Sequence, residues 1–165
     1  IYIGQSKLLG LPAPVWYIFA ILLLFSFLSR RTVFFRRFYF IGGNEKAARL
    51  SGINVEKMKI WGFVISASLA GIAGILLSSR LGAALSTSGA GLELRVITAV
   101  ILGGASLSGG YGTVWGAFLG VLFMALINNL LIVSRVSGYS QHLILGIILS
   151  AAVGLHHLIL KRFGK

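Results

Sequence analysis

The sequence predicts an all-α integral membrane protein. We expect a single transmembrane domain over residues 1–165, with about four spanning helices, a short broken or re-entrant helix and a short cytoplasmic helix. Hydrophobic residues make up 57% of the 165 residues and charged residues only 11%, whereas a soluble domain has roughly a quarter charged residues. The net charge of +12 comes from basic residues at the ends of apolar runs. This placement indicates membrane orientation and argues against nucleic-acid binding.

Four apolar runs approach the roughly 20 residues that a helix needs to cross the hydrocarbon core. They cover residues 11–28, 60–77, 114–133 and 143–160. A fifth apolar segment, residues 96–107, is only about half as long as a span and leads into a glycine-rich stretch. Its length and its glycines predict a broken or re-entrant helix.

The basic residues set the expected orientation. Residues 30–59 hold eight Lys or Arg and two Glu, whereas residues 78–95 hold two Arg and one Glu. The connection over residues 30–59 is therefore predicted to be cytoplasmic, and the basic residues within 161–165 place the C-terminus on the same side. For this orientation to hold, residues 96–133 must cross the membrane and return. The short segment over residues 96–107 must therefore traverse most of the membrane.

The cytoplasmic connection contains the signals of a short, well-bounded helix. Asn44 is placed to cap its N-terminus, Glu45 lies in the first turn, where the helix dipole favours an anion, and Gly52 supplies a left-handed residue at its end. Asn54 is placed to cap the helix that follows. We therefore predict a helix of about two turns over residues 45–51, held rigidly to the next span.

Two environments for this short helix remain open at this point. Isolated helices of such length are marginal in water, so it is expected to pack against something. The alternative is a membrane-surface helix that lies on lipid headgroups through Lys46 and Arg49.

Small residues recur at four-residue spacing within the apolar runs. The rows are Ser66, Ala70 and Gly74; Gly104, Ser108, Gly112, Gly116 and Gly120; and Gly146, Ser150 and Gly154. Such rows let helix backbones approach closely. The densest stretch holds Gly103, Gly104, Ser106, Ser108, Gly109, Gly110 and Gly112. Glycines there break the helix, and the backbone amides and carbonyls that lose their helical partners must face protein or a water-filled cavity. Two interpretations are therefore open: a translocation pathway and a buried structural kink.

Asn128 and Asn129 interrupt the apolar run over residues 114–133. Amide side chains are costly in lipid, so both are expected to face other helices. Hydrogen bonding between helices and contact with a transported substrate are the two interpretations.

The sequence gives little support for catalysis or metal binding. No Gly-Lys-Ser/Thr ending follows the glycines, so this chain is not expected to bind ATP. His142, His156 and His157 lack nearby carboxylates, and no metal site is predicted. One enzyme hypothesis stays open, because Gly104-Ala105-Ser106-Leu107 fits the G-x-S-x pattern of rhomboid-type intramembrane serine proteases, with His142 or His156 later in the chain. A membrane scaffold is the remaining alternative.

Three motifs in order carry a resemblance to a known family. They are IGGNEKAARLSGINVEKMK at residues 41–59, SLAGIAG at 68–74 and VILGGASLSGG at 100–110. With these motifs the chain closely resembles the permease subunit of bacterial ABC importers for simple sugars, which include ribose, xylose and galactose systems. The resemblance runs from about residue 8 to the C-terminus and implies the C-terminal half of a permease about twice this length.

The resemblance also implies roles for particular residues. The coupling segment that docks on the ATP-binding subunit would include Asn44, Glu45, Ala47, Ala48, Arg49, Leu50 and Gly52, with Glu45 and Arg49 offering charge to that subunit. Residues 96–120 are similar to the segment near the translocation pathway. Phe35 stands where the family has glycine, and Phe40 where alanine is common, which makes the approach to the coupling segment bulkier.

The implied mechanism is alternating access in the bacterial inner membrane. The implied partners are two ATP-binding cassette subunits that hold ATP, a second permease subunit, either identical or different, and an external sugar-binding protein. This chain itself is expected to bind no cofactor. Branched-chain amino acid permeases belong to the same broad superfamily and are the alternative substrate class.

Overall fold

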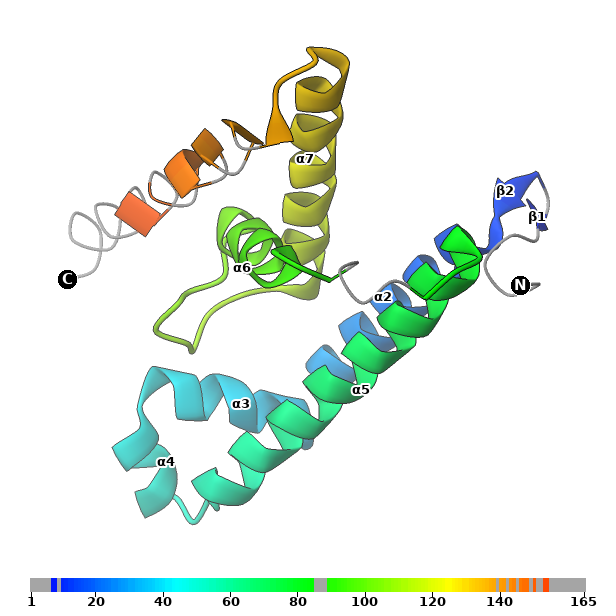
Figure 1. Cartoon of the computed structure of the whole chain (residues 1–165). Coiled ribbons are helices and arrows are strands. Elements are labelled where there is room, and N and C mark those ends of the chain that lie inside the picture. Colours follow the sequence, from blue (N-terminus) through cyan, green and yellow to red (C-terminus); the bar gives the residue numbers. More distant parts are fainter. Residues whose placement is uncertain are drawn as a thin grey trace. The chain divides into compact units, whose positions relative to one another are not determined.

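The computed structural model describes residues 7–8, 10–84, 89–138, 140–141, 143–144, 146–148, 150 and 153–154. By its internal contacts the chain separates into two compact units, residues 1–89 and 90–165. Helices form nearly all of the regular structure in both units (Figure 1). The predicted all-α fold is therefore confirmed.

The first unit begins with a minimal antiparallel pairing of β1 (Lys7–Leu8) and β2 (Leu11–Pro12). The first long helix, α2 (Ala13–Arg31), follows directly. It ends at Thr32, whose extended backbone stops the helix and whose hydroxyl donates a hydrogen bond to the Leu28 carbonyl. The chain then turns into a second helix without a loop.

This second helix, α3 (Val33–Gly43), was not predicted from the sequence. Phe34, Phe35 and Phe38 are half-buried on one side of it, at spacings that a helix brings together. The Phe34 ring meets the Phe38 ring edge-on with centroids 5.5 Å apart, and it meets the Trp61 ring of the long helix α5 at 6.2 Å. Aromatic packing therefore fixes α3 to the start of α5.

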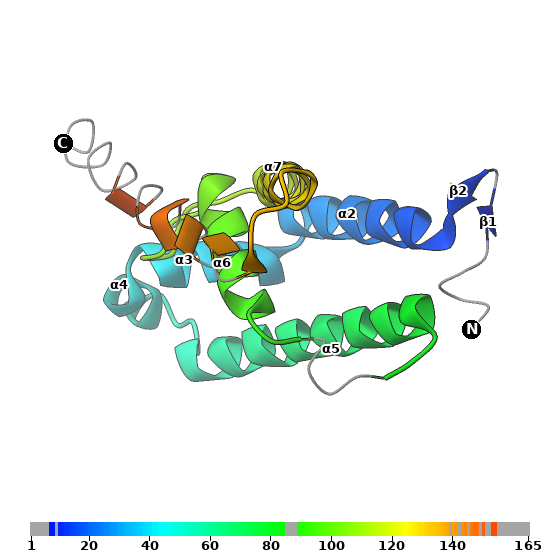
Figure 2. The same cartoon turned by 45° about the horizontal axis from the view of Figure 1, so that its top comes forward.

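The helices α4 (Glu45–Leu50) and α5 (Val55–Leu81) complete the first unit. Figure 1 shows α3, α4 and the first turns of α5 folded against one another, and these three helices contact each other in pairs. From this corner α5 runs back alongside α2 in the opposite direction (Figure 2). Its apolar side chains are exposed, with Ile60 at 61% and Phe63 at 77%, as expected for a helix that meets lipid or other helices of a larger assembly.

The second unit is a helical hairpin of α6 (Leu92–Leu102) and α7 (Val114–Val133). The sequence predicted the short segment over residues 96–107; the helix instead begins at Leu92 and ends at Leu102. Gly104 explains the earlier end, because its φ of +86° is left-handed and interrupts the helix. At about 16 Å, α6 is about half as long as the hydrocarbon core is thick.

Three helices within the described residues are long and apolar enough to cross a membrane, namely α2, α5 and α7. They match the predicted runs over residues 11–28, 60–77 and 114–133. The fourth predicted run, residues 143–160, lies largely outside the described residues.

Candidate functional site

The short helix α4 is bounded by the signals that its sequence predicts. The Asn44 side-chain oxygen accepts a hydrogen bond from the Ala47 amide at 3.0 Å. Gly52 has a φ of +79°, the left-handed conformation that ends the helix. The Asn54 side-chain oxygen accepts from the Lys57 amide at 3.0 Å and caps α5. Only residues 51–54 separate α4 from α5, so the connection has little freedom.

Four charged side chains tie α4 to the first turns of α5. Glu45 accepts hydrogen bonds from Arg49 on its own helix at 3.0 Å and from Lys59 of α5 at 2.8 Å. Arg49 in turn contacts Glu56 of α5 at 2.9 Å. Each ion pair is solvent-exposed, and such pairs contribute little stability. Two of them, Glu45–Lys59 and Arg49–Glu56, join α4 to α5 and so orient the two helices relative to each other.

The contacts within this network shift two pKa values. Hydrogen bonds from Lys59 and then Arg49 lower the pKa of the Glu45 carboxyl, and hydrogen bonds to Glu45 and Glu56 raise the pKa of Arg49. Both groups are therefore fully charged at neutral pH. Glu45 and Arg49, which the family resemblance implies offer charge to a partner, are both paired within the chain.

The two sides of α4 differ sharply in exposure. Leu50 is 91% exposed, and Ala47, three residues earlier on the same side, is also exposed. Ala48 is only 5% exposed and faces inward. Of the predicted docking residues, Ala47 and Leu50 therefore form the outward apolar surface, and Ala48 is not part of it.

The glycine-rich stretch forms a compact loop over residues 103–113. The Ser106 amide donates to the Tyr111 carbonyl at 3.0 Å, and the Gly109 amide donates to the Ser106 carbonyl at 3.1 Å. Gly109 and Gly110 have φ values of +86° and +77°, a region that residues with a Cβ rarely adopt. The loop therefore satisfies part of its own backbone, which both the kink and the pathway interpretations allow.

The predicted residues of this stretch do not act as one helical row. Gly104, Ser108 and Gly112 lie in the loop, where Ser108 is exposed. A Cβ built on Gly112 would lie 3.1 Å from the Ala105 Cβ, so this glycine allows the loop to close on itself. Only Gly116 and Gly120 of the row lie in α7.

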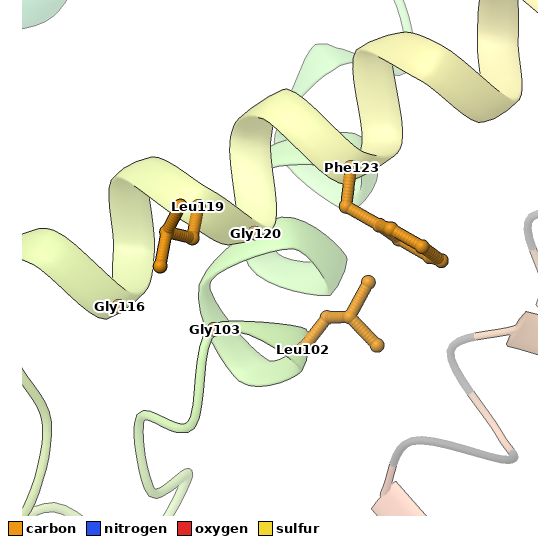
Figure 3. Close-up of a pocket in the computed structure, with 6 residues that line it drawn as sticks. All are labelled: Leu102, Gly103, Gly116, Leu119, Gly120 and Phe123. Atoms are coloured by element: carbon orange, nitrogen blue, oxygen red, sulfur yellow. The ribbon is translucent and has the colours of Figure 1, made fainter.

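At the crossing of α6 and α7 the two backbones touch. A Cβ on Gly103 would lie 2.9 Å from the Ala117 amide, and a Cβ on Gly120 would lie 2.9 Å from the Gly103 amide. Figure 3 shows Gly103 beneath the turn of α7 that carries Gly116 and Gly120. A crevice of about 370 Å³ beside this crossing is lined by Leu102, Gly103, Gly116, Leu119, Gly120 and Phe123. Its lining is apolar, so it offers no groups for chemistry.

A second groove on the same hairpin contains polar atoms. It has a volume of about 220 Å³, and Arg95 of α6 and Asn128 of α7 both line it. Arg95 Nε and Asn128 Oδ1 are buried without a hydrogen-bond partner among the described residues. Asn129, the other predicted amide, is exposed and does not line this groove. The two asparagines thus have different surroundings.

The histidines that the protease hypothesis needs are not among the described residues. Ser106 lies in the 103–113 loop, whereas His142, His156 and His157 lie outside the described residues. Among the described residues no group of three or more His, Cys, Asp or Glu is placed to hold a metal ion.

The helix α3 and the position of Arg95 were not predicted from the sequence. The helix α3 has a signal in the spacing of Phe34, Phe35, Phe38 and Ile41, which repeats as a helical face does. Arg95 has none that distinguishes it from the other basic residues at the ends of apolar runs. Its place opposite Asn128 depends on the crossing of α6 and α7.

Comparison with known proteins gives consistent matches. The family described as "Branched-chain amino acid transport system / permease component" matches residues 2–153. The chain is 40% identical, over 97% of its length, to the probable ABC transporter permease protein YphD of Escherichia coli, and covers 48% of that protein. It is 41% identical, over 92% of its length, to the L-arabinose transport system permease protein AraH of Escherichia coli, and covers 46% of it.

The xylose transport system permease protein XylH of Escherichia coli is 46% identical over 87% of this chain, which covers 37% of that protein. The chain thus spans about half or less of the length of the curated relatives it matches. No solved structure matches it significantly. Because the match to the family extends over residues 2–153 of 165 and includes α2 to α7, this chain belongs to the branched-chain amino acid transport system / permease component family of membrane permeases.

Proposed function

We propose that this chain is the part of a permease subunit that couples ATP hydrolysis in a partner to the import of a simple sugar across the bacterial inner membrane. Several of its relatives are named as arabinose, ribose and xylose transport permeases. The three apolar helices α2, α5 and α7 support a multi-pass arrangement. The protease and scaffold hypotheses receive no such support.

The observation that carries this proposal is the attachment of α4 to α5. Glu45 bonds Arg49 within α4 and Lys59 on α5, so that force applied to α4 reaches a 27-residue spanning helix. Caps at Asn44 and Asn54 keep both helix starts ordered. The exposed Leu50 supplies the apolar contact that a docking helix needs.

The proposed mechanism is alternating access. Closure of an ATPase dimer on ATP displaces α4 as a rigid lever, and α5 transmits this displacement to the helices that line the path. The loop over residues 103–113 serves as the turn between α6 and α7 beside that path. ATP is bound by the partner, and this chain binds no cofactor.

The proposed assembly contains two ATP-binding cassette subunits, a second permease subunit and an external sugar-binding protein. Membership in a family of transport-system permeases supports the first and last of these. The exposed apolar surface of α5 supports contact with further membrane helices, from the rest of the permease or from the second subunit.

A branched-chain amino acid is the second candidate substrate, because the family description names it. The test is uptake into vesicles that contain the full-length permease, its ATPase and its binding protein. We expect ATP-dependent uptake of arabinose, ribose or xylose, and none with an ATPase that cannot hydrolyse ATP. Uptake of leucine, isoleucine or valine in place of every sugar would reject the sugar assignment.

A further inference from the structure

The groove between α6 and α7 that Arg95 and Asn128 line has the features of a ligand site. Arg95 Nε carries a hydrogen-bond donor and Asn128 Oδ1 is an acceptor, and both atoms are buried without a partner among the described residues. A buried polar atom left unbonded costs about 1–3 kcal/mol. Two such atoms in one groove therefore indicate that a further group, absent from the structure, forms hydrogen bonds with both.

If α7 spans the bilayer, as its length and composition allow, the groove lies at membrane depth. Asn128 is about 7 Å along the axis from the midpoint of α7, well inside the hydrocarbon core, whose half-thickness is about 15 Å. An arginine or asparagine at this depth is costly unless it faces a cavity or another polar group. Such residues are by default candidates for a substrate pathway.

The other side chains that line the groove indicate the chemistry of a ligand that would fit there. They are apolar: Leu92, Val96, Ala99, Val121, Met124 and Ala125. A ligand that fits must therefore combine an apolar face with a group that both accepts and donates a hydrogen bond. The volume of about 220 Å³ is several times the roughly 30 Å³ of one water molecule.

We propose that this groove binds the transported sugar, with Arg95 donating to, and Asn128 accepting from, hydroxyl groups of a pentose or hexose ring. A hydroxyl accepts from Nε–H and donates to Oδ1, while the C–H face of the ring lies on the Val96, Ala99 and Met124 side of the groove. This assignment rests on the proposed sugar import and adds the residues that contact the sugar.

The first test uses the full-length permease in vesicles with its ATPase and binding protein. Arg95→Met and Asn128→Leu each remove one hydrogen-bonding group at similar side-chain size. We expect KM for the transported sugar to rise roughly ten-fold or more in each, the loss typical of a buried hydrogen bond to a charged or unreplaced group. Leu126→Ala, on the exposed side of α7 and outside the groove, is the control and should keep the original KM.

A second measurement needs neither polar residue to be changed. A single cysteine is placed at Ala125, which lines the groove, or at Leu126, which does not, in a permease without other cysteines. Sugar should slow alkylation of Ala125→Cys and leave Leu126→Cys unaffected. This measurement shows whether the groove binds sugar even if Arg95→Met or Asn128→Leu fails to reach the membrane.

The outcomes separate this inference from the proposed function. If sugar is imported but KM is unchanged in both polar variants, or sugar leaves alkylation of Ala125→Cys unaltered, the groove is not the sugar site and its polar atoms bond to other helices. If the unaltered permease imports no sugar, the proposed function fails first. Protection of Ala125→Cys by leucine alone would overturn both.

Discussion

Gly103 at the end of α6 and Gly116 in α7 touch through their backbones. A Cβ on either residue would overlap the backbone of the other. Glycine at these two positions is therefore what allows α6 and α7 to cross so closely. The crossing in turn sets which faces of the two helices form the groove that contains Arg95 and Asn128.

Replacing Gly116 or Gly120 by alanine should separate the two helices. The added methyl group at Gly120 would meet the Ala99 carbonyl, which belongs to helix backbone and does not move aside easily. We expect a loss of about 1–3 kcal/mol in stability, measured as a lower unfolding midpoint of the detergent-solubilised permease. Gly43→Ala is the matched control, because nothing lies within 4 Å of a Cβ there. Equal midpoints for all three variants would show that the crossing is not tight.

Asn44→Ala should loosen α4 without unfolding the permease. The side chain of Asn44 bonds the Ala47 amide, and loss of such a cap typically costs about 1 kcal/mol. Amide hydrogen exchange of residues 45–50 should therefore accelerate several-fold, while exchange in α7 stays unchanged. Asn44→Asp keeps an acceptor at this position and should exchange like the original protein. Unaltered exchange in Asn44→Ala would mean that packing on α3 and α5 alone holds α4.

Glu45→Gln should free α4 from α5. The neutral amide loses the charged contacts with Lys59 and Arg49, so the distance distribution between spin labels at Leu50 and Lys57 should broaden. Lys46→Gln, which changes a neighbouring charge outside the network, should leave that distribution narrow. A narrow distribution in Glu45→Gln would assign the orientation of α4 to its caps.

The same network predicts a pH dependence. Because hydrogen bonds lower the pKa of Glu45 in the folded chain, the network is complete above the ordinary carboxyl value of 4.5 and is lost as the pH falls through the lowered folded-state pKa. Spin-label distances should thus be constant at neutral pH and broaden only in acid. Broadening between pH 6 and 8 would exclude Glu45 as the group responsible.

Phe34→Ala should detach α3 from α5. The Phe34 ring contacts those of Phe35, Phe38 and Trp61, and each such pair contributes about 0.5–1.5 kcal/mol beyond its buried area. We expect a lower unfolding midpoint and altered Trp61 fluorescence. Phe40→Ala removes a ring that is 67% exposed and should change neither. The reverse order of effects would place α3 in a different orientation.

The helix α4 could be predicted from the sequence because its signals are local. The groove lined by Arg95 and Asn128 could not, because it depends on tertiary contacts. Asn44, Gly52 and Asn54 act within a few residues of their position, so their roles follow from the sequence alone. The helix α3 was missed because its arginines suggested only a basic connection. Arg95 and Asn128 lie 33 positions apart in the sequence and line the same groove. Local patterns do not encode such a placement.

In the proposed mechanism α4 docks on an ATPase through its outward side. The most direct test is cysteine crosslinking in the full-length permease, with a cysteine in the groove of the co-expressed ATPase. Leu50→Cys, at a position that is 91% exposed, should crosslink with a yield that changes on ATP binding, while Ala48→Cys, at a position only 5% exposed, should not crosslink. Free labelling of Leu50→Cys with no crosslink at any ATP concentration would contradict the claim and favour a helix that lies on the membrane surface.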